Sequence, residues 1–535
     1  MQMIKTEFVY NKGFKWYTED NVSIKGFLYD AENNFYEKES FLHFVKKIDS
    51  KDKLLQVLKK ATGLFTIYIQ FPGNKFLLAN DIIRSFPVFY KLENNKIHLS
   101  DDIHILIKEK PIEINPISEI EFKSAGFVSG HNTLIENIYT TQSGELVEYQ
   151  NNKIEITSYF YYNTEETSQK EYPELERKSI QVIRNVFTRL IQSLNKKLAI
   201  IPLSGGLDSR LIACMLKELD YKNVLCYTFG RKENNPEKEI SEKVAKALNF
   251  DWVFIEYNQQ NVGDFLNASF FGEYYQYYSQ YASSFMFQDF FAVKYLKEKK
   301  LIPQDAVFIP GYSGDFLGGS QLYKNGGVKE KTTARRIAKN IVNERYINTK
   351  LNRKEKQTIR KKVEKQICTQ SNNKDLAYSI FENWEIKENL SKFIGHTTSI
   401  YDFWEYEYRL PFWDLEFVNF FKHIPYKYKY GKPLYNNSLF FYFKNQQVDF
   451  NYGINLNPKE FKIYSLKKKI KKHLPYVIKR RISHTADILN YDFLLSEIKD
   501  ELRKNKKIKE KYLLTQNSYL AHWYLKKIKE SNRNL

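Results

Sequence analysis

The sequence predicts an α+β part rich in strands, then an α/β part with a doubly wound parallel sheet, and finally a helical C-terminal part. Up to about residue 165, short β-branched and aromatic runs alternate with turn residues, as is typical of antiparallel strands. After residue 169, amphipathic stretches alternate with short apolar runs, which indicates parallel strands with crossover helices. A chain of 535 residues exceeds what one core usually supports. We therefore expect three regions, 1–165, 166–450 and 451–535.

The strand-rich part contains a predicted hairpin. Residues 63–70 and 75–79 are strand-like and are joined by a turn at 71–74, which contains Pro and Gly. Shorter strands are expected at 88–90 and 96–99. These runs predict a mainly antiparallel sheet.

The second part begins with a predicted helix at 172–194 and continues with alternating strands and helices. The predicted strands are 197–201, 223–230 and 252–256, and the predicted crossover helices are 207–219 and 237–249. Within the helices, every third or fourth residue is apolar. The pattern predicts two consecutive βαβ units.

A loop rich in Ser and Gly joins the strand at 197–201 to the helix at 207–219. It consists of Leu203, Ser204, Gly205, Gly206, Leu207, Asp208 and Ser209. Glycines let the backbone approach a ligand closely, and a helix N-terminus favours phosphate. A carboxylate in this place is explained if Asp208 holds a divalent cation on a triphosphate. The loop predicts binding of ATP with Mg²⁺.

The full loop resembles the signature of the ATP pyrophosphatase superfamily, whose members cut ATP between its α and β phosphates and form adenylates. It is not the Walker A pattern, because no Gly-Lys-Ser/Thr follows. In doubly wound sheets, ligands lie beyond the carboxyl ends of strands. We expect the backbone of Thr228, Phe229 and Gly230 to lie near the adenine.

Residues 307–319 resemble a loop of the asparagine synthetase family within that superfamily. Asp315 matches the second magnesium-associated carboxylate of the family, and Gly311 matches a residue that packs against the nucleotide. Tyr312 and Phe316 stand where the family has acids. Their presence argues against free aspartate as the substrate.

A second segment, residues 407–414, also resembles this family and is followed by several lysines. The family places a catalytic lysine just before an element that Leu434 and Tyr435 match. Lys432 is the positional match, and Lys429 is the alternative. A cation here would stabilise charge that develops on the α-phosphoryl group.

The N-terminal part resembles the glutamine-hydrolysing domain of the same family, which implies an Ntn-hydrolase-like β-sandwich. The resemblance rests on residues 78–90, which include Asp81 and Arg84, and on residues 99–101, 133–138 and 143–144. In the family, a cysteine at the start of the mature chain attacks glutamine. This chain begins Met-Gln-Met, and its first cysteine is Cys214. We expect a glutaminase-like fold without that activity.

The resemblance implies a ligase that adenylates a carboxylate and transfers ammonia or an amine to it, as in asparagine biosynthesis. A sugar acid or a peptide is expected as substrate instead of free aspartate. The nitrogen would come from free ammonia, a separate glutaminase or an amine substrate. An RNA-modifying ATP pyrophosphatase and a catalytically silent scaffold remain alternatives. The oligomeric state is open, with a homodimer among the options.

Composition favours a cytoplasmic protein. No run of about 18 uncharged apolar residues occurs, and the start does not have the pattern of a signal peptide. None of the three cysteines forms a C-x-x-C pair, which argues against disulfides and thiolate zinc sites. An aromatic stretch at 270–287 either lines a water-excluding substrate pocket or forms packed core.

The net charge is +20, from 83 Lys and Arg against 63 Asp and Glu. Basic residues concentrate at 467–472 and 479–481, which suits either a solvated helix face or contact with an anionic membrane. The glutaminase-like part argues against a nucleic-acid partner, although the charge alone would suit one.

Overall fold

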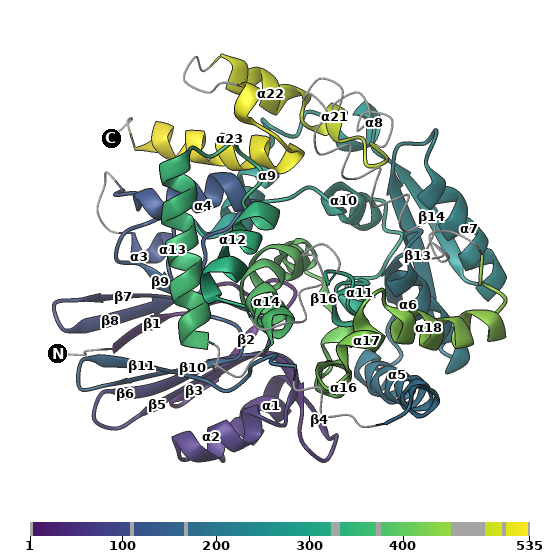
Figure 1. The fold of residues 1–535 in the computed structure, drawn as a ribbon, viewed down its shortest axis with the longest axis horizontal. Helices are drawn as coiled ribbons and strands as arrows, with labels where there is room; N and C mark the ends of the chain where they lie inside the picture. Colours follow the sequence, from purple (N-terminus) through teal and green to yellow (C-terminus); the bar gives the residue numbers. More distant parts are fainter. Residues whose placement is uncertain are drawn as a thin grey trace.

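The N-terminal residues form two sheets that pack face to face (Figure 1). In the computed structural model, the described residues are 4–107, 112–164, 170–322, 332–370, 376–450, 487–504 and 510–532. The first sheet has the order β1-β8-β7-β9, and the second has the order β11-β10-β6-β5-β3-β2 with β4 beside β3. These strands are β1 (Ile4–Glu7), β2 (Trp16–Glu19), β3 (Val22–Tyr29), β4 (Phe35–Glu37), β5 (Thr62–Phe71), β6 (Lys75–Asn80), β7 (Phe89–Glu93), β8 (Lys96–Ser100), β9 (Tyr139–Thr140), β10 (Glu145–Gln150) and β11 (Lys153–Ser158).

Side chains alternate across the second sheet as a strand period of two requires. On β6, Phe76 and Leu78 pack against the first sheet, whereas Leu77 and Ala79 pack toward helices on the other side. These helices are α1 (Lys38–Val45) and α2 (Lys51–Leu58). The short helix α3 (Ile103–Leu106) contacts β7 and β8 of the first sheet. The result is a layered helix–sheet–sheet–helix arrangement.

The predicted hairpin is confirmed. Strands β5 and β6 pair antiparallel, with Phe71 opposite Lys75 at the turn. Gly73 and Asn74 have φ values of 79° and 55°, a left-handed conformation that Gly and Asn tolerate best.

The second part is built on a five-stranded sheet in which every pair of neighbours is parallel. Its order is β14-β13-β12-β15-β16, so the chain reverses direction across the sheet between β12 and β15. The strands are β12 (Ala199–Pro202), β13 (Val224–Gly230), β14 (Asp251–Glu256), β15 (Val307–Phe308) and β16 (Glu407–Tyr408). Such a switch point is where doubly wound sheets bind ligands, beyond the carboxyl ends of the strands.

Helices surround this sheet and join it to the N-terminal layers (Figure 1). The predicted helices at 172–194, 207–219 and 237–249 are confirmed within two residues. Helix α6 is buried along residues 209–216 and not on one face alone, because α5 and α18 also contact it. The helical segments are α4 (Pro116–Ala125), α5 (Tyr172–Leu194), α6 (Leu207–Glu218), α7 (Pro236–Leu248), α8 (Gln259–Val262), α9 (Ser269–Ser279), α10 (Phe290–Glu298), α11 (Gly314–Leu317), α12 (Ala334–Arg345), α13 (Arg353–Gln370), α14 (Ala377–Glu385), the π-helix η1 (Ile386–Ile394), η2 (Gly395–Thr398), α15 (Ser399–Phe403), η3 (Pro411–Trp413), α16 (Leu415–Lys422), α17 (Tyr426–Lys429) and α18 (Pro433–Asn445).

The described C-terminal helices belong to the same core. They are α21 (Tyr491–Leu494), α22 (Ser496–Arg503), η4 (Glu510–Tyr512) and α23 (Gln516–Ser531). From α23, the Trp523 ring lies 5.9 Å from the Phe271 ring, and the Tyr524 ring lies 5.7 Å from the Phe122 ring. The basic stretch predicted at 467–481 lies outside the described residues. Within the described helices, none is long and apolar enough to cross a membrane.

Candidate active site

The predicted phosphate loop lies between β12 and α6, at the switch point of the sheet. The Leu203 N–H donates to the Tyr227 carbonyl at 2.8 Å, which continues the β12–β13 pairing into the loop. The Ser209 Oγ accepts from the Ser204 N–H at 3.1 Å, and the Ser204 Oγ accepts from the Gly206 N–H at 3.1 Å. Gly206 is exposed and immediately precedes α6. The loop is therefore held by its own serines, with the start of α6 open to a ligand.

The loop after β15 packs directly on this turn. A β-carbon on Gly311 would lie 2.6 Å from the Ser209 backbone nitrogen, a distance at which any side chain clashes. The sequence expectation for Gly311 was a close approach to the nucleotide; the structure shows a close approach to the phosphate loop. The two loops on either side of the switch point thus touch.

Asp208 is held at both of its carboxylate oxygens. The Tyr435 hydroxyl donates to Oδ1 at 2.7 Å, and the Asp315 N–H donates to Oδ2 at 3.0 Å. Burial, and then the nearby Asp315 carboxylate, raise the pKa of Asp208 to about 7. The two carboxylates predicted to hold magnesium therefore face each other across the switch point.

Lys432 approaches the same place from the start of α18. Its Nζ lies 3.9 Å from Oδ2 of Asp315. Lys432 has a left-handed backbone with φ of 60°, and its N–H donates to the Lys429 carbonyl at 2.8 Å. Asp208, Asp315 and Lys432, distant in sequence, thus converge as the sequence predicts.

Lys429, the alternative lysine, points elsewhere. Its fully buried Nζ contacts both carboxylate oxygens of Glu382 at 2.7 and 2.8 Å, and it lies 3.3 Å from the Tyr162 hydroxyl. Burial lowers the pKa of Lys429, and the Glu382 carboxylate opposes that shift. In this geometry, Lys429 links α17 to α14 and does not face the two aspartates.

Two further glycines make room for the Tyr435 ring. A β-carbon on Gly314 would lie 2.5 Å from the Tyr435 hydroxyl oxygen, and one on Gly318 would lie 2.6 Å from its ring. The glycines of the 311–319 loop therefore allow close contact with protein groups. Sequence reasoning assigned no role to Tyr435 or Glu382. The role of Tyr435 could have been inferred from its position, three residues after Lys432 at the start of a helix.

The end of β13, where adenine is expected, has mixed accessibility. The Thr228 hydroxyl already forms hydrogen bonds with the Leu203 carbonyl and with the Ser241 hydroxyl, each at 2.6 Å. Phe229 is half-buried and stacks on Tyr257 with ring centroids 5.1 Å apart. A β-carbon on Gly230 would lie 2.3 Å from the carbonyl oxygen of residue 488. Only backbone atoms and the Phe229 ring remain as candidate adenine contacts.

The residues that replace the acids of the resembled family differ in their surroundings. Tyr312 is half-buried, with its hydroxyl 3.5 Å from Oε1 of Gln288. Phe316 is buried in the core. In the aromatic stretch, Phe271, Tyr274, Phe285 and their neighbours form a buried ring cluster, which supports the packed-core interpretation.

The donors present suit a divalent cation bound together with a triphosphate. Among the described residues, no group of three or more His, Cys, Asp or Glu could hold a metal alone. Asp208 and Asp315 supply two carboxylates, and their mutual repulsion would be relieved by a cation. Mg²⁺ is usually bound by one or two carboxylates with phosphates and waters. The pair therefore fits such an ion.

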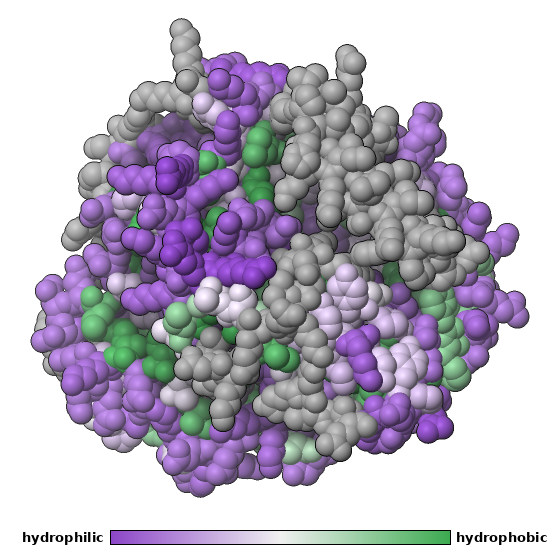
Figure 2. Space-filling model, viewed as in Figure 1, coloured by the Kyte–Doolittle hydropathy of each residue, from purple (hydrophilic) through white to green (hydrophobic). Residues whose placement is uncertain are grey.

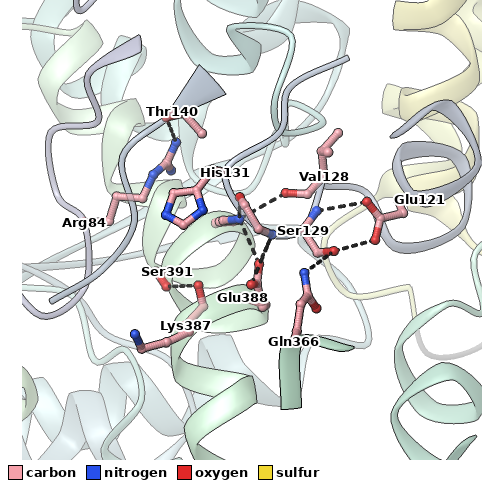
Figure 3. Close-up of polar contacts among 12 residues, drawn as sticks. Arg84, Glu121, Val128, Ser129, His131, Thr140, Gln366, Lys387, Glu388 and Ser391 are labelled. Carbon is pink, nitrogen blue, oxygen red and sulfur yellow. Dashed lines mark hydrogen bonds and ion pairs between the residues drawn. The ribbon is translucent and has the colours of Figure 1, made fainter. Parts of the chain in front are cut away.

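The N-terminal layers meet α13 and η1 through a buried polar network (Figure 3). The Gly130 N–H donates to both carboxylate oxygens of Glu388 at 3.1 and 3.0 Å, and Gln366 donates to the Ser129 hydroxyl at 2.9 Å. Arg84, matched to the glutaminase-like motif, donates to Thr140 and to the Thr141 carbonyl. The contacts of Gly130 and Ser129 connect the two parts of the chain, whereas those of Arg84 lie within the N-terminal part.

Comparisons with known proteins agree with the position of this site. The asparagine synthase family model matches residues 199–439, a range that includes Asp208, Asp315 and Lys432. The microcin J25-processing protein McjC of Escherichia coli is 22% identical over 218 residues, which are 40% of this chain and 40% of that protein. The match thus spans well under two thirds of that relative.

Solved structures also match part of the chain. Among them is the NH3-dependent NAD synthetase from Campylobacter jejuni subsp. jejuni NCTC 11168 in complex with the nitrate ion. It shares 13% identity, and the match covers 38% of this chain and 97% of that one, with a TM-score of 0.21. That score is too low for a comparison of the two folds.

Proposed function

We propose that this chain is an ATP-dependent amide ligase that releases AMP and pyrophosphate, because the asparagine synthase family model matches residues 199–439. The observation that carries the proposal is the convergence of Asp208, Asp315 and Lys432 at the switch point of a parallel sheet. The substrate carboxylate attacks the α-phosphorus of ATP and pyrophosphate leaves. Ammonia or an amine then attacks the acyl carbon, AMP leaves, and the nitrogen loses a proton.

The residues of the site have separate tasks in this reaction. The N–H groups at the start of α6 and the serines of the 203–209 loop bind the pyrophosphate portion. Lys432 stabilises negative charge on the α-phosphoryl group, a contribution worth several kcal/mol in comparable sites. Asp208 and Asp315 would hold Mg²⁺, which would neutralise charge on the triphosphate.

We further propose a peptide carboxylate as the substrate. Tyr312 and Phe316 replace acids of the resembled family, which argues against aspartate, and the Escherichia coli relative is named for processing a microcin. A sugar acid is the alternative. Residues 1–213 contain no cysteine, so a glutaminase-like N-terminal part would not hydrolyse glutamine itself. The nitrogen would then come from ammonia, a separate glutaminase or an amine substrate.

The test is isotope exchange between labelled pyrophosphate and ATP, with magnesium and a panel of peptide carboxylates, uronic acids and aspartate. Exchange that requires one carboxylate and is lost in Asp208→Ala supports adenylation and identifies the substrate class. The matched control is Asp251→Ala, an exposed aspartate at the amino end of β14 in the same sheet. Absence of Mg-ATP binding by the wild type would contradict the proposal and favour a silent scaffold.

A further inference from the structure

The positive charge of this chain is concentrated in two segments. Residues 332–370 contain twelve Lys and Arg against three Glu, a net charge of +9. Residues 451–486, outside the described part, also carry +9, which leaves +2 for all other residues together. General enrichment in lysine would spread the charge evenly. The segment 332–370, which is described and forms α12 and α13, is therefore a local basic feature.

On α13, three lysines form a stripe opposite its buried face. Lys354, Lys361 and Lys365 are exposed and are spaced seven and four residues apart, which places them on one side of a helix. The buried residues of α13 are Ile359, Val363 and Ile367, on the opposite side. The lysines therefore point directly away from the core.

Helix α12, which packs against α13, carries three more exposed cations. Arg335, Arg336 and Lys339 are exposed, and α12 packs against α13 around a shared apolar cluster. We call these six side chains the basic helical face. Figure 2 shows strongly hydrophilic side chains over the region of α12 and α13.

The basic helical face has no ion pairs with other described residues. In contrast, Arg345 and Lys362 on the same two helices pair with Glu385 and Glu121 at 2.6 Å each. Lys361 and Lys365 are four residues apart, a spacing at which like charges repel. Arg335, Arg336 and Lys354 lie in the first turns of their helices, where positive charge is unfavourable. An anionic partner would relieve both effects.

The side chains around these cations indicate which class of anionic partner the basic helical face would bind. Among the described residues of α12 and α13, no large apolar or aromatic side chain is exposed. Insertion into a membrane surface requires exposed apolar residues, and binding of single-stranded nucleic acid usually uses aromatic stacking. An acidic polypeptide requires only complementary charge.

We propose that the basic helical face binds an acidic segment of the peptide substrate. This inference rests on the proposed function, since a small free carboxylate needs no contact outside the active site. Helices α12, α13 and α14 share one apolar cluster, and the Glu382–Lys429 pair joins α14 to α17, three residues before Lys432. A peptide bound on α12 and α13 thus lies on helices that contact α14, which the Glu382–Lys429 pair joins to the turn before Lys432 (Figure 1).

The test is fluorescence anisotropy with the full chain and a fluorescein-labelled peptide in which Glu alternates with Gly and Ser. We expect binding that weakens steeply with salt and is lost when Gln replaces Glu in the peptide. The charge-reversal variant Lys354→Glu/Lys361→Glu/Lys365→Glu should bind at least about tenfold more weakly. The milder triple Gln variant should lie between it and wild type, which guards against misfolding as the cause.

The control reverses three exposed lysines on other elements, Lys59, Lys60 and Lys153, with the same change in net charge. Binding within about twofold of wild type is expected for it. Equal losses in both triple variants would overturn the inference. So would an RNA duplex or anionic vesicles that bind more tightly than the peptide and whose binding is weakened as much by the charge reversal. Pyrophosphate exchange on the same variants with a short carboxylate separates this inference from the proposed function. Normal exchange with lost peptide binding supports the docking face, whereas absent exchange in wild type counts only against the ligase.

Discussion

Tyr435 and Asp208, which lie 227 positions apart in the chain, share a hydrogen bond of 2.7 Å between the Tyr435 hydroxyl and Oδ1 of Asp208. The other oxygen of Asp208 accepts from the Asp315 N–H. The orientation of this carboxylate therefore depends on the loop after β15 and on α18 as well as on its own helix. A group fixed in this way is pre-oriented for a cation.

Replacing Tyr435 with Phe should lower pyrophosphate exchange by about tenfold or more, because a hydrogen bond to a charged group contributes about 1.5–3 kcal/mol. The Tyr435 hydroxyl also lowers the pKa of Asp208, so the pH profile of exchange should move to higher pH. The control is Tyr442→Phe on the same helix, whose hydroxyl donates to the Ile180 carbonyl. An unchanged pH profile in Tyr435→Phe would show that the hydroxyl does not act through Asp208.

Binding of Mg-ATP should release a proton near pH 7. The pKa of Asp208 is raised to about 7, so this carboxyl is partly protonated in the free protein and must ionise to hold a cation. Calorimetry in buffers of different ionisation enthalpy would measure the release. It should disappear at about pH 9, where Asp208 is already ionised, and in Asp208→Asn at every pH. Release that persists in the Asn variant would assign the proton to another group.

Substitutions of the two candidate lysines should affect different properties, activity for Lys432 and stability for Lys429. Lys432→Met should lower exchange by about 10²–10³ without changing the urea midpoint, since it removes a cation from a partly buried site where its ion pair with Asp315 is long, at 3.9 Å. Lys429→Met should destabilise the fold by about 3–5 kcal/mol, because it leaves Glu382 buried without its partner. Combining Lys429→Met with Glu382→Leu should restore much of that stability. If Lys429→Met loses exchange activity but keeps its full stability, the catalytic role belongs to Lys429 instead.

Stability should fall as the pH is lowered from 6.5 toward 4, in part through His396. Burial lowers the pKa of His396 to about 4, below its ordinary value of 6.5. In this window the unfolded chain binds a proton that the folded chain excludes, so unfolding is favoured as the pH falls, by up to about 3 kcal/mol. Urea unfolding of wild type and His396→Gln at pH 5 and 7 would measure this. The difference between the two pH values should be smaller in the variant, and an equal difference would place the effect on other groups.

Much of the fold and part of the site could be predicted from local sequence. The β5–β6 hairpin, helix α5 and the β12–α6 turn follow from residue spacing, because turn chemistry and side-chain periodicity act over a few positions. The same holds for the loop from Leu203 to Ser209, in which the serines hydrogen-bond to each other. The basic stripe on α13 likewise follows from the seven- and four-residue spacing of its lysines.

Which distant side chains meet depends on the tertiary structure. Lys429 and Lys432 differ by three positions and carry the same chemistry, yet one is buried against Glu382 and the other faces Asp315. The local sequence is enough to place a cation and two carboxylates near a phosphate loop. Their pairing depends on through-space packing between α14, α17 and the loop after β15, and no local pattern encodes that packing.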